Sequence, residues 1–186
     1  MEDQKMKANF EELDKETREF MLEEFETEQN SGNPFTGHLL SDTGKELFPE
    51  LIKEAIVSED EEFLVISLSR QEYWKEKQEY TRDGITREKR INFNQAAERL
   101  GFSEFNTWYV RGLARKLITE GVEKCQIYRA KKAKWEPGEC SKHEGQIVDV
   151  KVIYEGHRAR YWPKKNDYAF SIPAQPGCHH TIRRVK

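Results

Sequence analysis

The chain has 186 residues, a length typical of one medium-sized domain or of a small domain with an arm. Charged residues make up 35% of it and the mean hydropathy is −0.92, which predicts a small core under a heavily charged surface. No apolar run approaches the roughly 20 residues of a membrane span, and the first ten residues lack the apolar segment of a secretory signal. Three cysteines, an odd number, favour a reducing compartment over a disulfide framework.

The net charge of −3 hides an uneven distribution along the chain. Residues 1–62 hold 19 acidic and 6 basic residues, a net charge of −13. Residues 63–186 hold 15 acidic and 25 basic residues, a net charge of +10. Such a division indicates an acidic arm that meets a basic partner, a basic body near nucleic acid, or attraction between the two halves of one chain.

Residues 8–29 are predicted to form an acidic helix with a narrow apolar stripe. The stripe has one gap and consists of Phe10, Leu13, Phe20, Met21 and Phe25. A narrow stripe suits a helix that lies on another surface, either of this chain or of a neighbouring subunit. We therefore predict that residues 1–30 form an acidic helical arm. Its candidate partner-binding residues are Phe10, Leu13, Phe20 and Phe25.

The next segments mix helix and strand signals. After a breaker cluster at residues 30–37, residues 41–57 predict a second helix that Ser41 or Asp42 caps and that Pro49 kinks or divides. The short apolar run at 63–68 predicts a buried strand. Aromatic and basic side chains alternate over residues 69–92, which suits either stacking on nucleobases or ordinary packing of a helix or hairpin.

The stretch 93–130 is predicted to hold a helical corner and then a strand. Ser103 is placed to cap a long amphipathic helix, Gly121 is placed to close it, and residues 125–130 form the strand. The spacing before that helix also resembles a helix-turn-helix, through Ala96, Ala97, Leu100, Gly101 and Ser103. In that alternative the candidate contacts to nucleic acid are Arg111, Arg115 and Lys116.

The C-terminal part predicts short strands at 146–154, 159–162, 168–172 and 181–185. The whole sequence therefore predicts an α+β fold with N-terminal helices, a central helical corner with one long amphipathic helix, and a small antiparallel β unit at the C-terminus. We expect three parts: the arm 1–30, a helical region with one strand at 31–121, and the β-rich unit at 122–186.

Cys140, His143, Cys178 and His179 are candidate zinc ligands, because structural zinc takes four Cys or His ligands and would staple a small β unit. The chain has no CxxC pair, and His179 and His180 point to opposite faces if they lie on a strand. The competing interpretation is a set of buried thiols and surface imidazoles without metal. Phosphate-binding and dinucleotide-binding glycine motifs are missing from the sequence, which predicts a protein without enzymatic activity.

Three C-terminal fragments, residues 104–130, 140–163 and 170–185, resemble bacteriophage and prophage proteins encoded among virion-assembly genes. The resemblance implies a non-enzymatic structural protein of the virion, near the head or the head-to-tail connector, assembled in the host cytoplasm. Adaptor proteins of that connector bind as rings on a portal and grip neighbours with terminal arms. This implies a homo-oligomer that contacts portal or neighbouring virion subunits. The alternatives are a helix-turn-helix regulator that binds DNA and a zinc-stabilised binding module.

Overall fold

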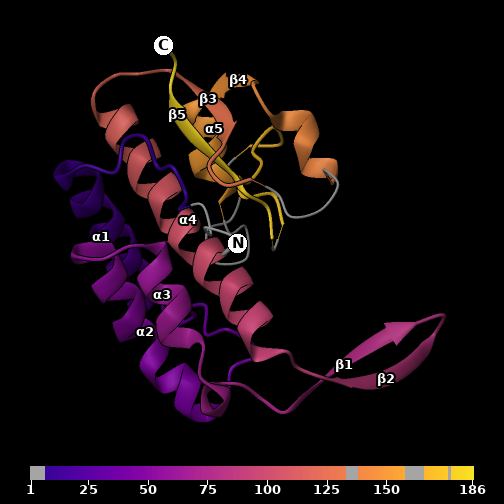
Figure 1. Ribbon diagram of the computed structural model, residues 1–186. Coiled ribbons are helices and arrows are strands. Elements are labelled where there is room, and N and C mark those ends of the chain that lie inside the picture. The colour runs from indigo at the N-terminus through magenta and orange to yellow at the C-terminus, as the bar shows by residue number, and fades with distance from the viewer. Residues whose placement is uncertain (1–6, 133–137, 158–165, 176) are drawn as a thin grey trace, which may run out of the picture.

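The structure is a computed structural model that describes residues 7–132, 138–157, 166–175 and 177–186 (Figure 1). Its helices and two small antiparallel sheets confirm the predicted α+β class. The helices are α1 Lys15–Gln29, α2 Asp42–Val57, α3 Glu61–Leu68, α4 Phe93–Thr119 and α5 Val150–Gly156, with the 3-10 helices η1 Gln71–Tyr73 and η2 Glu139–His143. The strands are β1 Lys77–Arg82, β2 Ile85–Arg90, β3 Lys124–Arg129, β4 Ile147–Asp149 and β5 His180–Arg184. Among these helices, none combines the length and the apolar character that crossing a bilayer requires.

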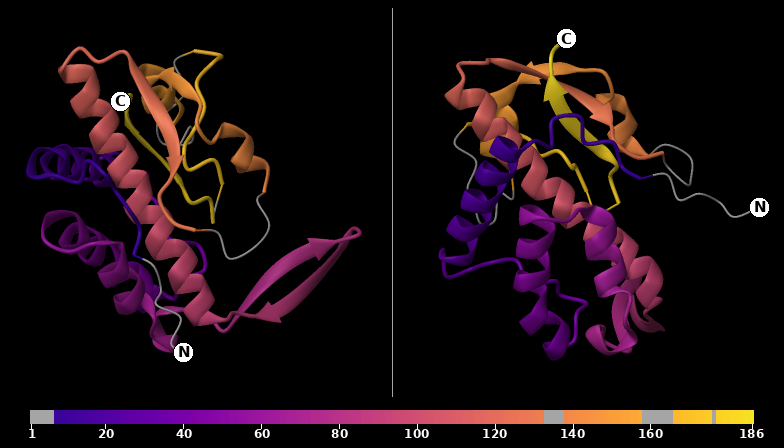
Figure 2. Two further views of the ribbon diagram at one scale, coloured as in Figure 1. Left: turned by 45° about the horizontal axis from the view of Figure 1, so that its top comes forward. Right: turned by 60° about the vertical axis from the view of Figure 1, so that its left-hand side comes forward.

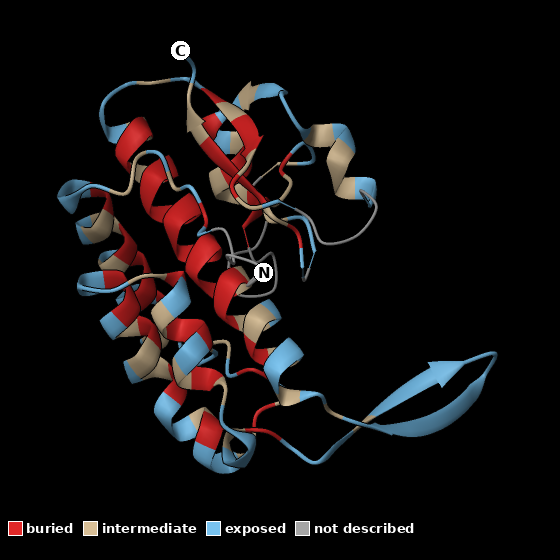
Figure 3. Cartoon of the chain, viewed as in Figure 1, coloured by how far each residue is buried: buried red, intermediate tan, exposed pale blue. Residues whose placement is uncertain are grey.

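Helix α4 is the element on which the other parts pack. Its 27 residues extend about 40 Å at a rise of 1.5 Å per residue. Helices α1, α2 and α3 lie on one side of it, and the three-stranded sheet with α5 lies on the other (Figures 1 and 2). The middle turns of α4 are buried around most of their circumference (Figure 3). A helix enclosed in this way is part of the core rather than a surface helix with one apolar stripe.

The predicted helical corner is wrong, because α4 is one continuous helix. It begins earlier than expected, where the Asn92 side chain accepts a hydrogen bond of 3.1 Å from the Gln95 amide. Gly101 lies inside the helix, where an added Cβ would sit 2.8 Å from Cγ2 of Val65 in α3. This glycine therefore permits close packing of two helices and makes no turn. Gly121 does close the helix, as predicted, with a φ of +77°.

Helices α2 and α3, which precede α4, agree with the prediction in one case and contradict it in the other. Ser41 caps α2 as predicted, accepting from the Gly44 amide at 3.2 Å, and α2 then runs through Pro49 as a single helix. Residues 63–68 belong to helix α3 and not to a buried strand. The Asp60 side chain accepts hydrogen bonds of 3.0 Å from the amides of Glu62 and Phe63, which starts the helix. A short apolar run alone does not separate the two structures.

The C-terminal sheet has the order β4-β3-β5, and both pairings are antiparallel. The predicted strands at 125–130 and 181–185 are confirmed as β3 and β5 with small shifts at their ends. The predicted strand at 146–154 is right only for β4, since the chain then turns into α5. Val150 and Ile153, three residues apart, are both fully buried, which is helical spacing. Residues 168–172 form no strand, and the predicted strand at 159–162 lies outside the described residues.

Strands β1 and β2 form a separate two-stranded hairpin that projects away from the body of the molecule (Figures 1 and 2). Its two-residue turn consists of Asp83 and Gly84, with φ angles of +54° and +74°. Positive φ at both turn positions matches the right-handed twist of the paired strands, and an Asp-Gly pair adopts it readily. Eleven of the twelve strand residues are exposed.

Candidate functional site

The N-terminal segment, predicted as an arm toward a partner, packs on α4 of the same chain. The Phe10 ring lies 4.8 Å from the Tyr109 ring, and Phe25 meets the edge of Trp108 at 5.3 Å. Phe25 is only 3% exposed, and Phe10 and Leu13 are partly buried against the same core. The prediction that these three residues contact a partner is therefore wrong, because they pack in the core of their own chain.

Phe20, the fourth candidate partner contact, is half-buried on α1. The guanidinium of Arg115 lies 5.5 Å from the centre of its ring. This contact is again made within the chain, so residues 7–29 supply few apolar side chains to a neighbour. The acidic helix belongs to the fold of its own subunit.

The three candidate contacts to nucleic acid are also used internally. Arg111 is fully buried and donates hydrogen bonds to Oε2 of Glu24 at 2.6 Å and to Oε2 of Glu28 at 3.1 Å. Glu24 and Glu28 are 2% and 0% exposed. The Tyr154 hydroxyl donates to the other oxygen of Glu24 at 2.8 Å, which ties α5 to the same cluster. Arg111 therefore holds three helices together and is not available to bind DNA.

Lys116 and Arg115, the other two candidate contacts to nucleic acid, also pair with acids of the same chain. Lys116 is 6% exposed and lies 2.6 Å from Asp14 and 3.2 Å from Glu16. Burial lowers the pKa of Lys116, but its hydrogen bonds to these carboxylates outweigh burial and raise that pKa. Arg115 contacts Glu23 at 2.8 Å and the buried Glu24 at 3.1 Å. With a single α4 and these internal pairs, the helix-turn-helix interpretation is wrong.

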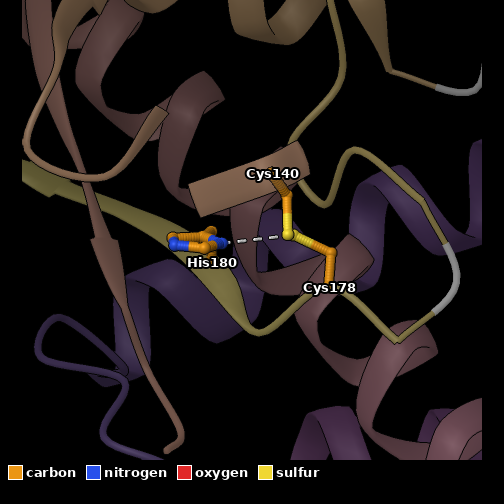
Figure 4. Close-up of side chains that lie close together, drawn as sticks. All are labelled: Cys140, Cys178 and His180. Carbon is orange, nitrogen blue, oxygen red and sulfur yellow. Dashed lines mark hydrogen bonds between the residues drawn. The ribbon is translucent and has the colours of Figure 1, made fainter. Parts of the chain in front are cut away.

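Two of the four candidate zinc ligands do come together, and His180, which the predicted set of four left out, is the third member of the group. Cys140 in η2, Cys178 before β5 and His180 at the start of β5 point toward one another (Figure 4). Their ligand atoms all lie within 4.8 Å of each other, and Sγ of Cys178 is 3.5 Å from Nδ1 of His180. Cys178 and His180 are 1% and 0% exposed, and Cys140 is half-buried.

His179 and His143, the other two predicted ligands, face elsewhere. The His179 ring packs edge-on against Phe102 at 4.9 Å, on the opposite side of the chain from its neighbours. His143 stacks on Phe170 at 5.5 Å and hydrogen bonds to the Gln146 side chain. The alternation of an extended chain was the signal for the correct residue, because positions 178 and 180 share a face and 179 does not.

A carboxylate orients the imidazole of this cluster. Nε2 of His180 lies 3.2 Å from Glu144, and Arg129 donates to the same carboxylate at 2.8 and 3.0 Å. The hydrogen bond from Arg129 is the main cause that lowers the pKa of Glu144. Burial lowers the pKa of His180 and raises that of the Cys178 thiol. A neutral imidazole whose Nε2–H donates to Glu144 presents the lone pair of Nδ1 to the sulfur atoms.

A cavity of about 870 Å³ lies between the first half of α4, the base of the hairpin and residues 170–175. Its walls are mainly apolar, with polar side chains at intervals, and include Phe35, Leu39, Arg99, Leu100, Glu104 and Phe170. Cys140, Cys178 and His180 do not line it, so the cluster and the cavity are separate features.

The hairpin presents two faces of different chemistry. Residues opposite each other share a face, so Gln78, Tyr80, Arg82, Ile85, Arg87 and Lys89 form one face, which we call the basic face. It holds three cations, an aromatic ring and an exposed isoleucine, but no acid. The other face, the mixed face, holds Lys77, Glu79, Thr81, Thr86, Glu88 and Arg90.

Comparison with known proteins finds no counterpart: no family model, no curated protein and no solved structure matches this chain.

Proposed function

We propose that this chain is a non-enzymatic structural subunit of a phage virion, near the head or the head-to-tail connector, that acts in many copies through protein–protein contacts. The resemblance of residues 104–130, 140–163 and 170–185 to virion-assembly proteins supports the phage setting. The projecting hairpin supports the assembly role and is the observation on which the proposal chiefly rests.

The hairpin contributes little to the fold of its own subunit. An isolated two-stranded ribbon is marginally stable in water, and this one packs no hydrophobic face on the body. Its mixed face even sets Glu79 directly opposite Glu88, a pairing of like charges that weakens a ladder. The salt bridge of 3.1 Å between Lys77 and Glu88 offsets this only in part, because both side chains are exposed. We therefore expect docking on another surface to stabilise this hairpin.

A second copy of the chain offers a surface of matching charge on α2. Four exposed acids follow one another at four-residue spacing, with Leu47 exposed between them: Asp42, Glu46, Glu50 and Glu54, which we call the acidic stripe. The acids of α1 pair largely with α4, as Glu24 and Glu28 do. Glu46, Glu50 and Glu54, by contrast, make no ion pair with a described residue.

The spacing of the two surfaces also agrees. Side chains four residues apart on a helix are separated by about 6 Å along its axis. Side chains two residues apart on a strand, such as Arg87 and Lys89, are separated by about 6.8 Å. The basic face can therefore lay successive cations beside successive carboxylates, with Tyr80 and Ile85 near Leu47.

This contact joins different surfaces of two identical subunits. A head-to-tail contact of that type generates a ring if the rotation closes and a filament if it does not. The hairpin points away from the body of its own subunit, which suits contact with a neighbour (Figure 3). In this proposal the hairpin takes the gripping role that the sequence assigned to the N-terminal helix.

A charge-swap experiment tests the contact. Arg82→Glu, Arg87→Glu and Lys89→Glu together reverse the basic face, and Glu46→Lys, Glu50→Lys and Glu54→Lys reverse the stripe. We expect each triple variant to weaken self-association at least about 10-fold in sedimentation velocity, because like charges then face each other. Mixing the two variants restores association by recreating opposite charges in a hetero-complex.

The matched control reverses the mixed face through Lys77→Glu and Arg90→Glu and leaves self-association within about threefold of the wild-type chain. Circular dichroism checks that every variant is folded. The proposal is contradicted if the wild-type chain stays monomeric, or if the mixture fails to associate. Tight binding of single-stranded DNA by the basic face, with no self-association, would support the nucleic-acid alternative for residues 69–92.

A further inference from the structure

The Cys140–Cys178–His180 cluster has the dimensions of a zinc site. With Zn–S bonds of about 2.3 Å and Zn–N bonds of about 2.0 Å, tetrahedral angles place sulfur and nitrogen ligands about 3.5 Å apart and two sulfurs about 3.8 Å apart. The distance from Sγ of Cys178 to Nδ1 of His180 is 3.5 Å, and all three ligand atoms lie within 4.8 Å of one another. Only small side-chain movements separate this arrangement from three zinc bonds.

The residues around the cluster prepare the imidazole to bind a metal. Metal-binding histidines commonly donate their second ring N–H to a carboxylate, which fixes the tautomer. Glu144 occupies that position on Nε2 of His180 at 3.2 Å. Arg129, through its two hydrogen bonds, holds the carboxylate in place. Glu144 and Arg129 therefore hold the imidazole in the orientation that metal binding needs. Packing of two thiols and a ring without metal would not require these contacts.

We propose that Cys140, Cys178 and His180 bind one zinc ion, which fastens η2 to the start of β5. Two thiolates and an imidazole favour zinc over magnesium or calcium, which prefer oxygen ligands. These three residues supply three of the four ligands that zinc takes, which leaves the fourth position for a water molecule. Because both cysteines lose protons on binding, zinc uptake releases protons and weakens at low pH.

The ion would stabilise the segment between η2 and β5. It links η2 to β5 across a segment of about 40 residues, whose described elements are only β4 and α5. Because the three ligands are brought together only in the folded chain, zinc binding stabilises the folded state and secures the edge of a three-stranded sheet. This role uses residues far from the hairpin and the acidic stripe, so it is independent of the proposed assembly contact.

The first test measures the metal in the purified full-length chain. We expect one zinc per chain by elemental analysis, and X-ray absorption should show two sulfur ligands at about 2.3 Å. Removing the metal with a chelator should lower the melting temperature by about 10 °C, the shift expected when free zinc exceeds its Kd by about 1,000-fold. Zinc should restore the melting temperature and magnesium should not.

Variants identify the ligands. Cys178→Ser and His180→Gln should each lose zinc, whereas the control His143→Gln, which changes a half-buried ring outside the cluster, should retain it. The inference is overturned if the folded wild-type chain takes up no zinc, or if His143→Gln loses zinc as fully as His180→Gln does. A disulfide between Cys140 and Cys178 in the freshly purified chain would also overturn it. The X-ray absorption result stands even if a variant fails to fold.

Discussion

Replacing Arg111 with methionine is expected to lower the free energy of unfolding by about 3–5 kcal/mol. Methionine fills a similar volume but leaves the carboxylates of Glu24 and Glu28 without their main cation, and these are 2% and 0% exposed. The free-energy cost of burying an unpaired carboxylate is much larger than the net stabilisation that the buried ion pair provides. Urea denaturation followed by circular dichroism measures the loss.

Two further variants separate charge from packing at this position. Arg115→Met, at a side chain 37% exposed, should cost no more than about 1 kcal/mol. Glu24→Gln and Glu28→Gln, added to Arg111→Met, should recover a large part of the loss because neutral amides remain where unpaired charges stood. A loss below about 1 kcal/mol for Arg111→Met itself would mean that the two glutamates do not need the guanidinium, contrary to the buried network described above.

The second large effect is expected for Gly112→Ala, at the centre of the contact between α1 and α4. An added Cβ would lie 2.5 Å from Cγ of Met21, 2.7 Å from its amide nitrogen and 2.9 Å from its Cα. Two of those atoms belong to the backbone, so relief requires α1 to move. We expect a destabilisation of about 3 kcal/mol, at the upper end of what overpacking costs. In a helix without such a neighbour, the same change would raise the free energy of unfolding by about 1 kcal/mol. A decrease for Gly112→Ala therefore indicates close packing of α1 on α4.

Gly138→Ala provides the matched control. An added Cβ there would meet only Nε2 of the Gln175 side chain, at 3.7 Å, which is ordinary contact. Its effect on the free energy of unfolding should stay within about 0.5 kcal/mol, as for other surface substitutions. If Gly112→Ala proved neutral or stabilising, α1 would not be seated closely on α4.

The sequence predicted the elements whose signals are local. The Ser41 cap, the closing glycine at 121 and the strand formers Ile127 and Tyr128 of β3 are signals from a few neighbouring residues, and all three predictions are confirmed. The Asp83-Gly84 pair between two alternating runs is an equally local signal for a hairpin, although residues 69–92 left helix and hairpin open as alternatives. The predicted turn at Gly101 is wrong because the sequence does not distinguish a glycine that permits close packing of two helices from a glycine that makes a turn.

The errors at the candidate sites arise from contacts between distant parts of the chain. Arg111 was a plausible contact for DNA until its partners, 83 and 87 residues earlier, were placed beside it. The prediction took His179 as a ligand, although the alternation of an extended chain places His180 and not His179 on the same face as Cys178. The charge division, by contrast, is partly an internal attraction, as the salt bridges of Arg183 with Glu11 and of Lys116 with Asp14 show. The exposed acids of α1, such as Glu16 and Glu23, pair with cations of the same chain, whereas Glu46, Glu50 and Glu54 of α2 pair with no described residue.

Native mass spectrometry of the full-length chain, with and without its hairpin, tests the assembly role most directly. Residues 77–90 are replaced by a short glycine-serine linker in the comparison protein, which should leave the core intact because the ribbon packs little on it. The account predicts multiples of the 22.0 kDa subunit for the wild-type chain and the mass of one subunit for the shortened chain. Multiples of the same order in both proteins, or single subunits in both at about 50 μM, would contradict it, because a contact with a Kd of about 1 μM is largely formed at that concentration.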